Sequence, residues 1–576
     1  MNEAKPNRST EAAPKQRFGE SLVTEGKITQ QQLDLALRQQ SKKGGLIGQI
    51  LVELGFASGR VVAQQVAREA QVPFVDVTLQ RAEAAALQRI PFFLARQFVA
   101  LPLMLEAGLL TVAMANPSNI YAVDALQKES GLPIEVVAAP EGDIITQIDK
   151  YYSTTENIEV TIARAMEDTD LAVTVVEKAV DLSATDDMDA PVIRLVSHIL
   201  ARAVDQGASD IHFEPEERIM RIRTRIDGEL FQDILIPKPM QSPVTTRLKI
   251  LAELDVAETR LPQDGRATLR IRGKQINLRV SSLPTTHGEN VVIRVLSSDP
   301  SLLRLQALGF AEDVYDQFNG MINRPYGVIL VTGPTGSGKT TTLYATLNEL
   351  PTMELSIFTL EDPVEYQMPV IRQTQIREDV GLTFAAGLRA LLRQDPDVIL
   401  VGETRDTETA TLMVRAALTG HMVLSTLHTN DSAGAMPRLV DMGVEPYLLP
   451  ASLIGIMAQR LVRVICPKCK QEMKSADKLF QQLGLRPTPG LPVKLYHGIG
   501  CAECRFSGFR GRQGIYELMV VNEKFHDPIV RRAGAPDFQR LARENGMRTM
   551  FEDGLAKAHQ GVTTLAELLR VIPATE

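Results

Sequence analysis

An apolar segment that runs into a glycine-rich loop and then into a helix-forming segment constrains this 576-residue chain more than any other feature. The segment Val328-Ile-Leu-Val-Thr-Gly-Pro-Thr-Gly-Ser-Gly-Lys-Thr340 contains the complete spacing G-x-x-x-x-G-K-[ST]. In such a loop, backbone N–H groups point at phosphates, the lysine reaches the β and γ oxygens, and the hydroxyl residue holds Mg²⁺. The chain is therefore predicted to bind a nucleoside triphosphate. The residues expected to contact ATP and Mg²⁺ are Gly333, Pro334, Thr335, Gly336, Ser337, Gly338, Lys339, Thr340 and Thr341.

Length and composition limit the number of domains and the classes of protein to which the chain can belong. At about 150 residues per domain, the chain is long enough for roughly three to five domains. It is 44% hydrophobic and 23% charged, as in an ordinary globular protein. The sequence contains no run of about 18 apolar residues, so no membrane-spanning helix is predicted. The first ten residues lack an apolar core, so a cytoplasmic location is expected. A net charge of −8 argues against broad binding to nucleic acid.

Changes in composition divide the chain into segments. The predicted α/β organisation is a disordered tail at 1–16, a helical module at 17–72, a small α/β domain at 73–152, an acidic linker at 153–190, a second domain at 191–300, and a parallel α/β domain of the RecA type at 305–576. The second domain begins with an apolar helix pattern and continues with strands that alternate apolar and charged residues. For part of the linker, Val160 to Lys178, a solvated helix is the alternative.

Two acidic segments follow apolar strand patterns. The strand predicted at Val398 to Val401 brings Glu403 to its carboxyl end, where doubly wound sheets bind ligands. A second strand pattern brings Glu361 and Asp362 to the same edge. Hydrolysis needs an oriented water, and we favour Glu403 as the residue that activates it, with Glu361 second. For either residue, a structural carboxylate at the end of a strand is the alternative.

All four cysteines fall into two C-x-x-C pairs. They are Cys466, Cys469, Cys501 and Cys504. Two such pairs present four thiolates, which is typical of a closed tetrahedral zinc site, predicted here as an insertion at 464–512. A redox pair is the weaker alternative, because no thioredoxin-like unit surrounds these residues.

These motifs together resemble the secretion ATPase superfamily and, within it, the type II secretion and type IV pilus assembly ATPases. The resemblance rests on the glycine-rich loop, Leu360-Glu-Asp-Pro363, the Asp395-to-Glu403 segment and Thr419-Gly-His-Met-Val-Leu-Ser-Thr-Leu-His-Thr-Asn-Asp431. It covers most of the chain from about 190 to 570, including Ala208 to Pro215, Arg260 to Arg266 and Gln459 to Arg463.

The resemblance implies a RecA-like ATPase domain preceded by a PAS-like α/β domain, in a homohexameric ring with ATP between the two domains. The family's arginines correspond to Arg266, Arg279, Arg389, Arg393, Arg405 and Arg438, with Arg266 and Arg279 assigned to catalysis beside Lys339. The family's γ-phosphate-sensing histidines correspond to His421 and His428. A surface arginine and a hydrogen-bonded neutral histidine are the alternatives for any one of these residues. The cysteine insertion favours an assembly or secretion motor over a retraction motor.

An internal repeat lies near the N-terminus. The segment from Arg17 to Gln40 recurs from Leu46 onward and resembles the tandem motif of the cyclic-di-GMP-binding domain of some members. The contacts that this resemblance implies are Arg17, Gly19, Leu22, Val23, Gly26, Gln40, Gly48, Leu51, Val52 and Gly55. The second copy has Leu46 in place of Arg17 and Glu69 in place of Gln40. A helical docking module without a ligand is the alternative.

We therefore expect a hexameric ATPase, peripheral to the inner membrane, that drives assembly of a pilus or a secretion pseudopilus. Its expected partners are an inner-membrane platform protein and the cytoplasmic part of a bitopic assembly protein. Two other functions remain open. One is a DNA-translocating motor on the same core, and the other is a cyclic-di-GMP receptor with weak ATP turnover.

Overall fold

The computed structural model describes residues 18–43, 46–152, 173–175, 190–296, 304–473 and 494–572. The chain divides into two compact units, one of residues 1–274 and 278–295 and the other of residues 275–277 and 296–576. The predicted tail, most of the predicted linker and the middle of the cysteine insertion lie outside the described residues. Within the described parts of the chain, no helix is long and apolar enough to cross a membrane.

The first unit begins with four helices that carry the sequence repeat. They are α1 (Phe18–Thr24), α2 (Gln30–Lys43), α3 (Ile47–Glu53) and α4 (Gly59–Ala70). Each copy of the repeat forms a short helix, a turn and a longer helix. Gly26 and Gly55 occupy equivalent turns with φ of +66° and +70°, a backbone conformation that glycine adopts without strain. The repeat in the sequence is therefore a repeat in the fold.

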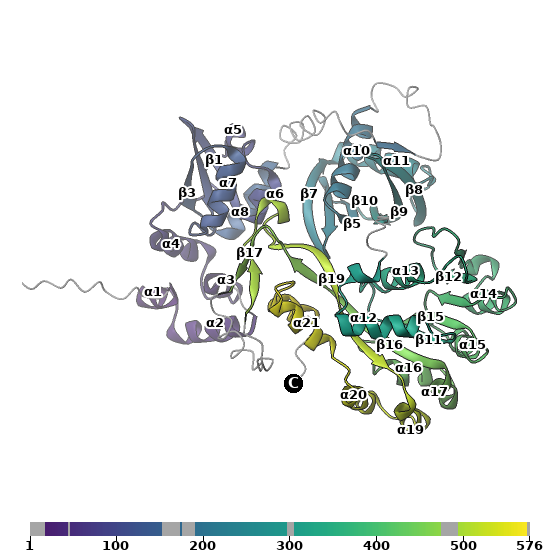
Figure 1. Ribbon diagram of the computed structural model, residues 1–576. Helices are drawn as coiled ribbons and strands as arrows, with labels where there is room; N and C mark the ends of the chain where they lie inside the picture. Colours follow the sequence, from purple (N-terminus) through teal and green to yellow (C-terminus); the bar gives the residue numbers. More distant parts are fainter. Residues whose placement is uncertain are drawn as a thin grey trace, which may run out of the picture. The chain divides into compact units, whose positions relative to one another are not determined.

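A small α/β layer follows the four helices (Figure 1). Its sheet has the order β1-β2-β3. The elements are α5 (Ala84–Leu87), α6 (Phe92–Gln97), β1 (Ala100–Glu106), β2 (Leu109–Met114), α7 (Ile120–Ser130), β3 (Ile134–Ala138) and α8 (Glu141–Tyr152). Strands β2 and β3 pair in parallel, as is compatible with the small α/β domain predicted at 73–152.

A seven-stranded sheet of order β4-β8-β9-β10-β5-β6-β7 forms the next part of this unit. Its elements are β4 (Val173–Val175), α10 (Ala190–Asp205), β5 (Ala208–Pro215), β6 (Ile219–Ile226), β7 (Glu229–Pro237), α11 (Lys238–Leu251), β8 (Gln263–Ile271), β9 (Lys274–Thr285) and β10 (Gly288–Leu296). Along β6, Met220, Ile222 and Thr224 are buried while the arginines between them are partly exposed, as the alternation predicted. Val173–Val175 belongs to the predicted linker but pairs with β8, because Val-Thr-Val favours a strand.

The second unit is built on a sheet of order β13-β12-β14-β15-β11-β16-β19, which is parallel except for β19 (Figure 1). The strands are β11 (Gly327–Thr332), β12 (Ile357–Glu361), β13 (Arg372–Gln375), β14 (Val398–Val401), β15 (Met422–Leu427), β16 (Leu453–Ile465) and β19 (Phe509–Val520). The order places β11, which leads into the glycine-rich loop, between β15 and β16. This arrangement confirms the predicted parallel α/β class.

Helices cover both faces of this sheet. They are α12 (Glu312–Ile322), α13 (Lys339–Glu349), α14 (Phe384–Leu391), α15 (Thr407–Leu418), α16 (Ala435–Asp441), α17 (Leu449–Ser452), α19 (His526–Val530), α20 (Ala535–Glu544), α21 (Met550–His559) and α22 (Leu565–Val571). Along β11, Val328 and Leu330 pack into one apolar cluster, and Ile329 and Val331 pack into another. Burial on both faces explains why β11 is apolar throughout. A two-stranded ribbon, β17 (Lys470–Glu472) and β18 (Tyr496–Gly498), adjoins the cysteines.

Candidate functional site

The glycine-rich loop lies between the end of β11 and the start of α13. A Cβ atom on Gly333, whose φ is +150°, would stand 2.5 Å from Ser337 Oγ and 2.7 Å from the carbonyl oxygen of Gln459. Only glycine therefore allows the loop to close this tightly. Pro334, Thr335, Gly336 and Thr340 are exposed, so the outer part of the loop is open to a ligand. The amino end of α13 supplies further N–H groups to an anion at this position.

Lys339 turns back onto its own loop in this structure. Its Nζ donates hydrogen bonds to the carbonyl oxygens of Gly333 at 2.8 Å and Pro334 at 3.1 Å. Burial lowers the pKa of Lys339, although the charge of Glu403 acts in the opposite direction. The ammonium group is therefore held in a partly dehydrated place where a phosphate would replace its two carbonyl partners.

Glu403 follows β14 at the same edge of the sheet, as predicted. It forms an ion pair with Arg405, and its Oε2 lies 3.6 Å from His428 Nε2. Two bonds to Thr426 on β15 hold the turn: its hydroxyl donates to the Gly402 carbonyl at 2.7 Å, and its carbonyl accepts from the Thr404 N–H at 3.0 Å. The structure thus brings together the loop lysine, an acidic residue, an arginine and a histidine.

Glu361 has different surroundings from Glu403. Its side chain is buried, with a residue exposure of 3%. Tyr344 donates to Oε2, and Oε1 accepts from Thr359 Oγ1 at 2.5 Å and from Gln373 Nε2 at 3.1 Å. These donors occupy both oxygens, which favours the structural alternative for Glu361 over a role in activating water. Asp362, the next residue, is exposed.

The two histidines of the Thr419–Asp431 segment lie at opposite ends of β15. His428 follows the strand at the edge that carries the loop. His421 precedes the strand, and its Nδ1 lies 2.8 Å from the carbonyl oxygen of Ala416 at the end of α15. A six-residue strand spans about 20 Å. The intervening strand separates His421 from the loop of its own chain, and its role as a phosphate sensor stays a prediction.

The six arginines divide between the two units. Arg266 on β8 and Arg279 on β9 belong to the first unit, whereas the glycine-rich loop belongs to the second, so their approach to ATP remains a prediction. In the second unit, Arg389 pairs with Glu408, and Arg393 donates to the Arg389 carbonyl at 2.8 Å. The remaining two are Arg405, paired with Glu403, and Arg438, which is exposed on α16.

The four cysteines form one cluster, as their spacing predicted. Their Sγ atoms all lie within 4.8 Å of one another. The Cys466–Cys501 and Cys469–Cys504 sulfur pairs are each 3.8 Å apart, and the Cys501–Cys504 pair is 3.7 Å apart. Four ligands at the Zn–S distance of about 2.3 Å place tetrahedral sulfurs about 3.8 Å apart. The cluster is therefore compatible with zinc.

Four of the predicted contacts in the N-terminal repeat, Gly19, Leu22, Gly48 and Leu51, are buried within the helical module. Leu22 and Leu51 have exposures of 1% and 0% and form its core. Gly19 and Gly48 allow helices to approach closely, since added Cβ atoms would meet Leu33 at 2.3 Å and Val62 at 2.8 Å. Val23, Val52 and Gln40 are at least partly exposed. Arg17, the predicted guanine contact, lies outside the described residues.

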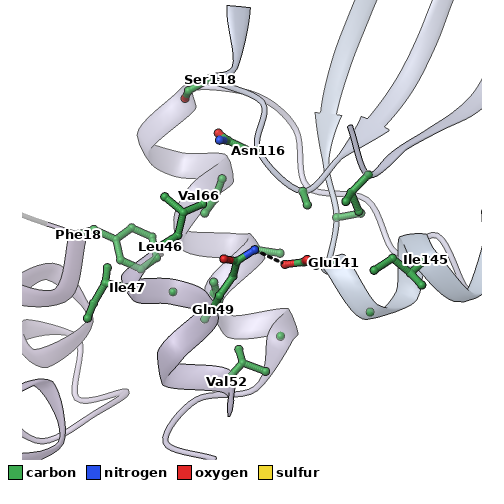
Figure 2. Close-up of a pocket in the computed structure, with 18 of the residues that line it drawn as sticks. Phe18, Leu46, Ile47, Gln49, Val52, Val66, Asn116, Ser118, Glu141 and Ile145 are labelled. Atoms are coloured by element: carbon green, nitrogen blue, oxygen red, sulfur yellow. Dashed lines mark hydrogen bonds between the residues drawn. The ribbon is translucent and has the colours of Figure 1, made fainter. Parts of the chain in front are cut away.

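A cavity of about 740 Å³ lies where the helical module meets the small α/β layer. Phe18, Leu46 and Ile47 contribute apolar walls, and Gln49 Nε2 donates to Glu141 Oε2 at 2.9 Å (Figure 2). The described lining residues include Glu53, Glu69 and Glu141 but no lysine, arginine or histidine. Gly48 and Val52 of the second repeat copy also line it. Such a lining disfavours a phosphate inside this cavity.

Tyr344 was not singled out from the sequence, and Gln459 was named only as part of the Gln459-to-Arg463 segment of the resemblance, without a role. Tyr344 donates a hydrogen bond to the carboxylate of Glu361, and Gln459 on β16 forms hydrogen bonds with both the glycine-rich loop and α13. The available signal for Gln459 was the polar pair Gln459-Arg460 directly after the run Leu453 to Ala458, which has no polar side chain. Such a pair in a buried strand indicates specific hydrogen-bond partners.

A glycine-rich phosphate loop at the carboxyl edge of a mostly parallel sheet, with an acidic residue on a nearby strand, defines the class of P-loop ATPases. The family model described as "Type II/IV secretion system protein" matches residues 185–570, and the one described as "MshEN domain" matches residues 70–158. The second match covers the small α/β layer and not the helical repeat.

Relatives agree with the first match over nearly the whole chain. The "Type IV pilus assembly ATPase PilB" of Myxococcus xanthus is 41% identical over 96% of this chain and 98% of its own length. "Type II secretion system protein E" of Xanthomonas campestris is 40% identical over the same shares of the two chains. "Type II secretion system ATPase E" of Vibrio cholerae is 48% identical over 68% of this chain and 77% of its own length. The chain therefore belongs to the type II/IV secretion system protein family, and it is an ATPase.

Proposed function

We propose that this chain hydrolyses ATP to drive assembly of a type IV pilus or of a type II secretion pseudopilus. The observation that carries the proposal is the convergence of Lys339, Glu403 and His428 at one edge of the sheet beside an open glycine-rich loop. The names of relatives that match 96% of the chain support the two assembly processes.

In this proposal the loop N–H groups and the amino end of α13 bind the phosphates. Lys339 exchanges its two loop carbonyls for β and γ oxygens. Thr340 holds Mg²⁺, which offsets phosphate charge when it is bound. Glu403 orients and activates water, and Arg405 leaves Glu403 to pair with the γ-phosphate, because a guanidinium binds phosphate oxygens with two parallel hydrogen bonds. His428 monitors the same phosphate.

The proposed assembly is a homohexamer. The seven-stranded sheet of the first unit and its helices form the PAS-like domain. Arg266 and Arg279 of this sheet complete an ATP site in the same chain or in a neighbouring chain. The ring acts at the cytoplasmic side of the inner membrane, on a platform protein and the cytoplasmic part of a bitopic protein. A nucleic acid is not among the proposed partners.

Two ligands are proposed in addition to ATP and Mg²⁺. The four cysteines hold a structural zinc ion, on the grounds of donor type and sulfur spacing. Cyclic-di-GMP regulates turnover through the first copy of the repeat, with Arg17 and Gln40 as its polar contacts. The match of residues 70–158 to the MshEN domain supports this regulation, and the acidic lining of the cavity favours the first copy over the second.

ATP turnover by the full chain tests the proposal. Rates are measured with and without cyclic-di-GMP, at a concentration where light scattering confirms hexamers, for wild type, Lys339→Ala, Arg17→Ala and the control Lys128→Ala, which changes an exposed lysine of α7. We expect Lys339→Ala to lose turnover and Arg17→Ala to lose only the response to the dinucleotide. Full turnover in Lys339→Ala would refute the assigned site. Strong stimulation of ATP turnover by DNA would favour a DNA-translocating motor. A turnover rate that is unchanged by cyclic-di-GMP would indicate that the N-terminal repeat is a docking module without a ligand.

A further inference from the structure

The side chain of Gln459 lies beside the point where β11 becomes the glycine-rich loop. β16 pairs in parallel with β11 as far as Ala458 opposite Thr332, and Gln459 is the next residue. It is 1% exposed. Its Nε2 donates to the carbonyl oxygen of Ser337 at 2.7 Å, and its Oε1 accepts from Thr342 Oγ1 at 2.9 Å.

Both ends of this carboxamide are therefore engaged by different parts of the nucleotide site. Ser337 belongs to the loop, and Thr342 belongs to the first turn of α13. The carboxamide of glutamine offers a strong donor and a strong acceptor on one planar group, so a single side chain can bond to both parts. Because both bonds are buried, water does not compete for them, and the loss of one partner would leave the other unsatisfied.

The bond to Ser337 also determines how the loop faces a ligand. In a trans peptide, the carbonyl and the following N–H point in opposite directions. Because the Ser337 carbonyl is held by Gln459 of β16, the N–H of Gly338 is directed away from that side chain. The main-chain oxygen of Gln459 packs against Gly333 from the same strand, so β16 supports the loop at both of its ends.

We propose that Gln459 is a positioning residue of the ATP site, which orients the loop N–H groups before the nucleotide binds. The proposal rests on the proposed function only in taking this loop as the phosphate site. Gln459 touches no reacting atom. Its contribution is to hold the loop in its binding shape, so that ATP does not have to order the loop as it binds.

The test compares full-length wild type with Gln459→Glu, Gln459→Met, Thr342→Val and the matched control Thr346→Val. The Thr346 hydroxyl is buried in the same helix but bonds only to the Thr342 carbonyl, so its removal probes stability without touching the loop. Three quantities are measured: the Kd of a fluorescent ATP analogue, KM with kcat, and the rise in unfolding temperature caused by ADP.

We expect both Gln459 variants to raise Kd and KM by about tenfold or more, because each leaves the Ser337 carbonyl unsatisfied. In Gln459→Glu the carboxylate would also face that carbonyl oxygen to oxygen. Thr342→Val should raise Kd by a smaller factor, and Thr346→Val should leave Kd unchanged. KM should rise more than kcat falls, and the ADP-induced rise in unfolding temperature should shrink, as weaker binding requires.

An unchanged Kd in the Gln459 variants would overturn the inference, as would an equal loss in Thr346→Val, which would indicate general destabilisation. If neither Gln459 variant folds, an unchanged Kd in Thr342→Val would overturn it, and a raised Kd would support it. Failure of the proposed function would give a different result. If the loop is not the phosphate site, wild type and Lys339→Ala would bind the ATP analogue with the same Kd.

Discussion

The phenol of Tyr344, on the helix that follows the glycine-rich loop, donates a hydrogen bond to the carboxylate of Glu361 at the end of β12. Burial raises the pKa of Tyr344 well above its ordinary value, and the charge of Glu361 raises it further. Tyr344 therefore stays protonated and remains a donor at any physiological pH. The bond ties α13 to β12, which favours the structural alternative for Glu361.

Tyr344→Phe should destabilise the ATPase unit by about 1–3 kcal/mol, because it removes one donor from a buried carboxylate. The measurement is the urea midpoint of the transition that reports this unit. Tyr447→Phe is the control, since Tyr447 is 64% exposed and its change should have little effect. Equal midpoints for Tyr344→Phe and wild type would show that the bond contributes nothing.

Glu403→Gln should lower kcat by at least about 100-fold while ATP binding is retained, because an amide cannot accept a proton from water. Single-turnover rates and the Kd of an ATP analogue separate the chemical step from binding. Glu361→Gln should mainly lower the unfolding temperature. The assignment of roles is reversed if Glu361→Gln loses turnover at full stability while Glu403→Gln remains active.

Purified protein should contain one zinc ion per chain, and Cys469→Ser should contain less. Metal analysis together with thiol titration checks this, since four sulfurs that ligate zinc react slowly until a chelator removes the ion. The same variant should unfold at a lower temperature. Four rapidly reactive thiols in metal-free wild type, with no change in stability on adding zinc, would contradict the site.

Glu567 should make stability depend on acid pH. Burial raises its pKa, but hydrogen bonds from Arg570 and Arg463 act more strongly in the opposite direction, so the pKa lies below its ordinary value. An unfolded glutamate titrates near about 4.3. The stabilisation is therefore full above that pH and is lost as the pH falls through the lower pKa of the folded state.

The comparison of wild type with Glu567→Gln, in unfolding midpoints from pH 7 to pH 3, measures this dependence. The difference between the two should be largest near neutrality and shrink in acid. Asp537→Asn is the control, because the ion pair of Asp537 with Arg540 has side chains that are 42% and 68% exposed and should contribute little. A difference that grows as the pH falls would contradict the assigned sign.

Local patterns were sufficient to predict the elements that carry the phosphate loop and Glu403. Each of these signals lies within a few residues: an apolar strand, then glycines and a lysine, or an apolar strand and then a carboxylate. The pairs of C-x-x-C predicted the sulfur cluster for the same reason. Alternating apolar and charged residues likewise predicted β6.

Contacts between segments that are distant in the sequence could not be predicted from such local patterns. The difference between Glu361 and Glu403 depends on Tyr344 and Gln373, which come from other elements. Val173–Val175 pairs with β8, which is far away in the chain. The acidic residues on either side of this short segment favoured the prediction of a linker over that of a strand. The position of His421 was open to prediction, because it precedes an apolar strand whose far end carries His428.

The distance along the chain between the loop and Gln459 has a consequence for biosynthesis. Ser337 and Thr342 leave the ribosome 122 and 117 residues before the glutamine that bonds to them. During that interval the loop has its glycines and its lysine but not β16, so we expect it to bind nucleotide weakly in the nascent chain. Ribosome-bound chains stalled before and after β16 has emerged would show whether nucleotide capture waits for that strand.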